Sequence, residues 1–172
     1  VTALADLTNL GELYLSGTNI YDVSALSALT NLRDLNLSDT NIDDVSPLKV
    51  LTTLEHLYLS NTNVADVSPL TVLTNLYQLH LRDTEVADVS ALVDLRNLCF
   101  LDIGDTDIED VRPLATLTML RTLHISNTSV KDVTALAKLT RLESMFLGNT
   151  QVTDVTVTAL AVALPKLKFR WY

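Results

Sequence analysis

Three side chains that could carry out metal or acid–base chemistry are spaced 22 residues apart in this sequence: His80, Asp102 and His124. Two imidazoles beside a carboxylate can bind Zn²⁺ or polarise a nucleophile. Such chemistry requires the three side chains to stand next to one another. Whether residues 22 positions apart are neighbours in space depends on how the rest of the chain is organised.

The same spacing runs through nearly the whole chain. Seven units follow the pattern Leu-x-x-Leu-x-x-Leu-x-Leu-x-x-Thr-x-(Ile/Val)-x-Asp-Val, with Ile or Met at a few of the later leucines. The units begin at Leu7, Leu29, Leu51, Leu73, Leu95, Leu117 and Leu139. A unit this short cannot bury its apolar residues alone, so neighbouring units must stack and share one core.

Within a unit, the alternation of residues predicts one short strand. Leu35 and Leu37 are two residues apart and share a face, so Asp34 and Asn36 face the other way. Parallel strands are thus predicted near residues 12–15 and every 22 residues onward to 144–147. About five residues, counted from the Ser or Thr of each Ser-Pro-Leu or Thr-Ala-Leu sequence, are available before the next leucine, which favours short 3₁₀ turns.

Two further positions are almost invariant and are predicted to be structural. A threonine at position 18 and every 22 residues after it should satisfy backbone groups of a turn. An aspartate at position 22 and every 22 after it should accept backbone N–H bonds, which is a simpler role than calcium binding. The Ser or Thr that follows each Asp-Val is expected to cap the turn, and Arg112 is expected to weaken its own turn.

These motifs resemble the leucine-rich repeat family, and the short repeats are similar to those of bacterial internalin-like proteins and a protein-phosphatase regulator. The resemblance implies an α/β fold: a right-handed solenoid, or horseshoe, with a concave parallel sheet and short 3₁₀ turns on the convex side. One domain, 1–172, is expected, with a partial first repeat at 1–6, repeats over 7–154 and a C-terminal partial cap at 155–172. A helix near 158–164 and an edge strand within 166–172 are predicted there, and the chain is expected to be a fragment of a longer one.

The outward positions of the strands vary most between units, and together they form a surface that we call the concave face. Exposed aromatic residues among polar ones are typical of binding surfaces, because they bury area at small entropic cost. The predicted partner-binding residues are Tyr14, His56, Tyr58, His80, Arg82, Phe100, Asp102, His124 and Phe146.

The three residues spaced 22 apart belong to this face and should form a row about 5 Å apart. A flat, solvated sheet holds ligands weakly, so no catalytic, cofactor or metal site is predicted. The row is interpreted as a polar patch in which His80 or His124 gains a proton near pH 6. The single cysteine, Cys99, is predicted to be a structural thiol.

The net charge of −9 disfavours nucleic acid and suggests a protein partner with a basic surface. No apolar run is long enough to span a membrane. The chain is predicted to be a monomeric, non-catalytic recognition module. Its compartment is left open between the cytosol and a bacterial secreted or surface location, since one cysteine cannot form an internal disulfide. Two alternatives stay open: a substrate-targeting domain of a larger enzyme or secreted effector, and a metal-dependent enzyme built on His80, Asp102 and His124.

Overall fold

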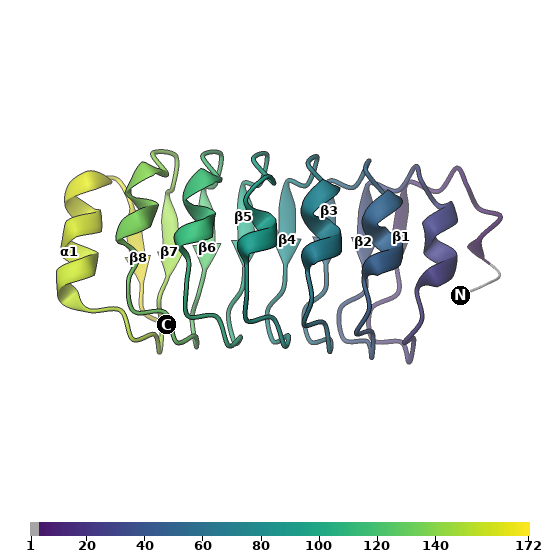
Figure 1. Cartoon of the computed structure of the whole chain (residues 1–172), viewed down its shortest axis with the longest axis horizontal. Helices are drawn as coiled ribbons and strands as arrows, with labels where there is room; N and C mark the ends of the chain where they lie inside the picture. The colour runs from purple at the N-terminus through teal and green to yellow at the C-terminus, as the bar shows by residue number, and fades with distance from the viewer. Residues whose placement is uncertain (1–3) are drawn as a thin grey trace.

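Each repeat forms one turn of a coil, with a short strand on one side and a short helix on the other (Figure 1). The computed structural model describes residues 4–172 of the chain. The repeats stack side by side along one long axis, from the N-terminal end to helix α1. The solenoid and its concave sheet, predicted from the repeat, are therefore confirmed. Residues 1–3 of the expected partial first repeat lie outside the described part.

The strands form a single parallel sheet in which each pairs with its neighbour in sequence order. Within the register, every residue pairs with the one 22 positions later, such as Leu35 with Leu57. The last step is longer, since Ser144 pairs with Lys168 after an inserted helix. The strands are β1 (Glu12–Tyr14), β2 (Asp34–Asn36), β3 (His56–Tyr58), β4 (Gln78–His80), β5 (Phe100–Asp102), β6 (Thr122–His124), β7 (Ser144–Phe146) and β8 (Lys168–Arg170).

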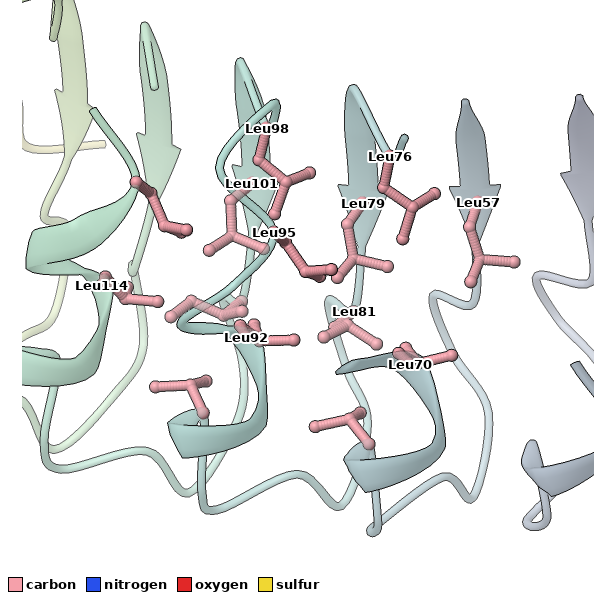
Figure 2. Packing of buried hydrophobic residues seen from close by; sticks show 14 of the residues in the cluster. Leu57, Leu70, Leu76, Leu79, Leu81, Leu92, Leu95, Leu98, Leu101 and Leu114 are labelled. Atoms are coloured by element: carbon pink, nitrogen blue, oxygen red, sulfur yellow. The ribbon is translucent and has the colours of Figure 1, made fainter. Parts of the chain in front are cut away.

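One continuous core runs between the sheet and the convex side. The central residue of each of the strands β2 to β7 is fully buried, and leucines from the return path meet it from the opposite side. Figure 2 shows this layering, with Leu79 and Leu101 from the strands near Leu92 and Leu95 from the return path. Fully burying one such side chain contributes about 1.5–3 kcal/mol before entropy is counted, which explains how short units become stable when stacked.

The convex side consists of 3₁₀ helices of three to five residues, as predicted. They are η2 (Ser24–Ala28), η3 (Ser46–Val50), η4 (Ser68–Val72), η5 (Ser90–Leu92), η6 (Arg112–Thr116) and η7 (Thr134–Lys138). The prediction that Ser or Thr caps these helices is wrong. The cap is the repeated aspartate, whose Oδ1 accepts the backbone N–H two residues later, at 2.7 Å for Asp44 and Ser46.

Arg112 does not weaken its turn either. Its backbone N–H donates to Asp110 at 2.9 Å, and its guanidinium donates to both oxygens of the same carboxylate. Because the backbone N–H of any non-proline residue can fill this role, η6 reaches five residues, whereas the Ser-containing η5 has three.

A second repeated hydrogen bond closes the turn that follows each strand. The threonine hydroxyl donates to the carbonyl three residues earlier, at 2.6 Å for Thr40 and Leu37, as the sequence predicts. The residue before that threonine has a positive φ of 52° to 58° in six repeats, and these residues are Asp39, Asn61, Asp83, Asp105, Asn127 and Asn149. Gly17 takes the same place in the first full repeat. Only Gly, Asn and Asp adopt this conformation readily, which explains the restricted choice.

The C-terminal end departs from the repeat. Helix α1 (Asp154–Ala163) begins four residues before the predicted helix and ends close to the predicted place, ahead of Pro165. Asp154 therefore opens a helix, where its charge suits the N-terminal dipole, instead of capping a 3₁₀ turn. Strand β8 then extends the sheet, with Phe169 beside Met145. At the other end Leu7 is 49% exposed.

Candidate functional site on the concave face

The predicted site residues all lie on the exposed side of the sheet, in three rows and not in two. The first row contains the first residue of each strand and the second row contains the third residue. Two positions beyond the second row, a third row runs just past the strand ends and consists of Ser16, Ser38, Ser60, Arg82, Gly104, Ser126, Gly148 and Tyr172. This third row was not predicted, although its repeated small residues were a usable signal.

Aromatic rings from different rows join into one stack, which we call the aromatic ladder: Tyr58, His80, Phe100, His124, Phe146 and Tyr172. Successive ring centroids are 4.6, 4.5, 5.3, 3.8 and 6.1 Å apart. The first four contacts are stacked or tilted, and the last is edge-to-face. Aromatic pairs in such arrangements contribute about 0.5–1.5 kcal/mol each beyond the area they bury.

Part of the aromatic ladder runs diagonally across the strands, because Phe100 comes from a different row than the rings on either side of it. Phe100 belongs to the first row, opposite Gln78 in the register, yet its ring stacks on His80 of the second row. Its other side meets His124, also in the second row. The five ladder residues on the strands are half-buried, so their outer edges remain accessible from the concave face.

Two predicted site residues stay outside the ladder. Tyr14 on β1 is 59% exposed, and its hydroxyl donates to Glu12 at 3.3 Å. His56 on β3 lies 2.6 Å from Asp34 through Nδ1, and its ring meets the edge of Tyr77 at 6.1 Å. The N-terminal third of the concave face is therefore more acidic and less aromatic than the rest.

Asp102 is placed differently from the prediction. The register confirms that His80, Asp102 and His124 are neighbours in one row. The Asp102 side chain is buried, however, because the residue is only 8% exposed between its larger neighbours. Its Oδ1 accepts the Gly104 N–H at 3.0 Å, and its Oδ2 lies 4.0 Å from His124 Nδ1. The Asp102 carboxyl group therefore lies beneath the surface that a partner would meet.

Burial also changes the two histidines of the row. Desolvation lowers the pKa of His80 below its usual value of 6.5, and the Asp102 charge offsets this only in part. The pKa of His124 is lowered by the same cause, with Arg82 adding to the effect. Both rings are therefore neutral at pH 7, and they gain a proton at a lower pH than an ordinary histidine does. His80 Nε2 is buried without a hydrogen-bond partner, which adds to the cost of moving this ring into the stack.

A pocket of about 330 Å³ opens beside the C-terminal half of the ladder. Ser126 and Gly148 of the third row line it, with His124 and Phe146 on one side and Asn127 and Asn149 on the other. Arg82, Trp171 and Tyr172 complete it. The pocket exists because the third row lacks large side chains there. Trp171 and Tyr172 were not among the predicted site residues, since both lie beyond the last repeat.

Arg82 reaches this pocket by lying across the next repeat. A Cβ atom at Gly104 would sit 3.3 Å from the Arg82 Nη1 and 3.1 Å from the Ser126 carbonyl oxygen, so a larger residue there would crowd the Arg82 side chain. The guanidinium forms an ion pair with Asp105, whose Oδ1 also accepts a hydrogen bond from Asn127 at 2.7 Å. Arg82 is thus a linker between repeats as well as a surface cation.

A larger hollow of about 660 Å³ lies on the flank of the solenoid, beside the N-terminal ends of the strands. Its polar groups are mostly committed to other protein groups. Arg33 pairs with Glu55, while Asn75 and Asn97 donate to backbone carbonyls of the preceding repeats at 2.8 and 2.9 Å. Cys99 lines this hollow and is buried, as expected of a structural thiol.

Neither hollow has the features of a metal centre. Over residues 4–172, the structure holds no group of three or more His, Cys, Asp or Glu side chains arranged to bind a metal ion. In the same range, no helix has the length and apolar character that a membrane crossing requires.

Comparisons with known proteins show which family has these features. A family model described as "Leucine Rich repeats (2 copies)" matches residues 8–50 and 52–94. The chain is 33% identical to an internalin and to internalin C2, both from Listeria monocytogenes, with TM-scores of 0.90 and 0.91. Each match covers 96% of this chain. The aligned part is 48% of the length of the first internalin and 72% of the length of internalin C2. A leucine-rich repeat protein from Leptospira interrogans shares the fold, with a TM-score of 0.92 at 20% identity, over 99% of the chain and 45% of its own length. Among curated proteins, none matches significantly.

Proposed function

The chain belongs to the leucine-rich repeat family, and from that premise we propose that it is a non-catalytic module that binds a protein partner on its concave face. Proteins of this family generally serve protein–protein interaction. The aromatic ladder is the observation that carries the proposal for this chain. It presents half-buried rings from five neighbouring strands in one stack, which the exposed ring of Tyr172 extends.

Rings held in this way suit a binding surface for two reasons. A ring that is already stacked loses little conformational freedom when a partner covers it, so more of the buried area contributes to affinity. Tyr and other aromatic residues also account for a large share of binding energy in measured interfaces. The convex side, by contrast, repeats one aspartate-capped turn.

The experiment compares the two sides of the molecule. Immobilised domain captures proteins from a lysate of the source organism, in parallel with a Tyr58→Ala/Phe100→Ala variant and a Lys49→Ala/Lys138→Ala variant. Lys49 and Lys138 are exposed at the ends of η3 and η7 on the convex side. A true partner should be retained by wild type and by the lysine variant but not by the ladder variant.

Calorimetry with the identified partner then gives the size of the effect. Replacing Tyr58, Phe100 or Phe146 by Ala should each weaken binding by about 1–4 kcal/mol. The lysine changes should alter binding by less than about 0.5 kcal/mol. A partner that is lost from the lysine variant and kept by the ladder variant would place the interface on the convex side and disprove the proposal.

A further inference from the structure

The pocket beside the aromatic ladder has two unlike ends. At one end lies Arg82, whose Cα is three repeats away from Gly148 in the third row, or about 14 Å at the spacing of strands in a sheet. At the other end lie three aromatic side chains, Phe146, Trp171 and Tyr172. Ser126 lies between them in the third row, and Asn127 and Asn149 also line the pocket, which is aromatic at its C-terminal end.

The aromatic end has the geometry of a cage. The rings of Phe146 and Tyr172 are almost perpendicular, with 83° between their planes and centroids 6.1 Å apart. Trp171 is a further wall, and it is 54% exposed while Tyr172 is 80% exposed. Unlike the inner rings of the ladder, these two are not stacked on both sides. Ring faces that remain free attract cations, and tryptophan does so best.

The charged groups around the pocket balance one another. Arg82, which lines the pocket, forms an ion pair with Asp105. Asp102 and Arg170 do not line the pocket, but each is the register neighbour of a lining residue, His124 and Phe146 respectively. One carboxylate and one guanidinium thus flank the pocket, and the aromatic rings decide which occupant is favoured.

We propose that this pocket receives a basic side chain, arginine or lysine, of the protein partner, which enters the aromatic cage formed by Phe146, Trp171 and Tyr172. This inference rests on the proposed function, since it names the chemistry that the concave face recognises. Acidic side chains are disfavoured by the negative faces of the aromatic rings.

The first test uses small probes and needs no partner. Trp171 is the only tryptophan of the chain, so its fluorescence reports this pocket alone. The domain is titrated with N-acetyl-arginine amide, with the uncharged isostere N-acetyl-citrulline amide, and with N-acetyl-aspartate amide. We expect arginine to bind about 2- to 30-fold more tightly than citrulline, which is the range that a cation–π contact provides. Equal binding of the two, or tighter binding of aspartate, would overturn the proposal.

Two variants and one control variant show which side chains are responsible for the binding. Tyr172→Leu removes one wall of the cage and should reduce the preference for arginine over citrulline. Arg82→Gln removes a like charge and frees Asp105, so arginine should bind more tightly to this variant. Tyr14→Leu removes an exposed tyrosine at the far end of the concave face and should change nothing. Weaker arginine binding in Arg82→Gln would overturn the proposal, because loss of a like charge should favour a cation in the cage.

Binding measurements with the identified partner distinguish a failure of this inference from a failure of the proposed function. If both are right, Phe100→Ala and Tyr172→Leu each weaken the partner, and the Tyr172→Leu loss disappears when one basic surface residue of the partner is replaced. If Phe100→Ala weakens binding and Tyr172→Leu does not, the cage is excluded while the concave-face interface stands. If neither change matters, the concave-face interface itself is wrong.

Discussion

The convex and concave sides of this molecule share the 22-residue period, but the convex side repeats one capping residue while the outward residues of the concave side change from strand to strand. On the convex side, the repeated aspartate accepts the backbone N–H two residues later at 2.7–2.9 Å in six repeats. On the concave side, no two neighbouring strands present the same pair of outward residues. A backbone requirement that recurs in every turn fixes the residue type there. An outward position on a strand has no such requirement, so it is free to serve recognition.

The largest expected effect separates the core from the concave face within one strand. Leu57→Ala removes a fully buried side chain of β3 and should lower the free energy of unfolding by about 2–5 kcal/mol. Tyr58→Ala, at the next position, removes a half-buried ring with one stacking contact and should cost no more than about 1.5 kcal/mol. Urea unfolding measures both. Equal losses would mean that the Tyr58 ring is part of the core and not of a binding surface.

The convex side provides the next effect. Asp44→Ala removes the acceptor of the Ser46 N–H and of the Ser46 hydroxyl, at 2.7 and 2.9 Å. Loss of such a cap costs about 0.5–2 kcal/mol of stability. Asp43→Ala makes the same change of charge at the preceding, exposed position and should stay within about 0.5 kcal/mol of wild type. If the two variants unfolded alike, the convex aspartates would act through charge and not through capping.

A third effect concerns the positive-φ position between the strand and the turn. Asn61 has a φ of 55°, and its side chain donates to Asp39 at 2.9 Å. Ala and Gly both lose that hydrogen bond, but only Gly adopts this backbone conformation freely. Asn61→Ala should therefore be less stable than Asn61→Gly by about 1 kcal/mol in chemical unfolding. A more stable alanine variant would show that this turn does not constrain the repeat.

The smallest effect is the dependence of stability on pH, which differs between the two sides. The folded-state pKa of His80 and His124 is lowered from 6.5, so the unfolded chain binds more protons below that pH. Their contribution to stability is complete above about pH 6.5 and is lost as pH falls from there toward the folded pKa. Convex aspartates such as Asp66 and Asp132 have a pKa lowered from 3.8, chiefly by backbone hydrogen bonds, and their contribution is lost only below that value.

Urea unfolding at a series of pH values between 8 and 3 should thus show two separate losses of stability. A His80→Gln/His124→Gln variant should lack the loss that begins near pH 6.5 and keep the more acidic one. A gain in stability on acidification from pH 7 to pH 5 would contradict the lowered pKa values, because it would require the folded state to bind more protons.

Much of the fold follows from residues that act locally. The spacing of the leucines predicts the strands and the shared core, and the threonine row predicts its bond to the turn carbonyl, such as Thr40 to Leu37. The aspartate row was also predicted correctly to accept backbone N–H bonds, as Asp44 does from Ser46. The cap predicted for the Ser or Thr two residues later was wrong. Both residue types are common in turns, and sequence spacing alone does not show that only the aspartate has the geometry to accept a bond.

The candidate site could be predicted only in part. The row of His80, Asp102 and His124 was predicted because a register of 22 residues follows from the repeat. The burial of Asp102, the diagonal stacking of Phe100 on His80 and the reach of Arg82 across Gly104 were not. Each depends on the size and direction of side chains from neighbouring repeats, which the period does not contain.

By itself, then, the sequence determined the period of the solenoid, the parallel sheet, the buried leucines and the residues that share the concave face. All of these follow from backbone hydrogen bonds and apolar burial that are identical in every unit. Only the tertiary structure decided which rings stack, which carboxylate is buried and where a pocket opens beside Trp171 and Tyr172. These outcomes depend on packing between side chains that differ from one repeat to the next, and such packing is fixed only when the repeats are in contact.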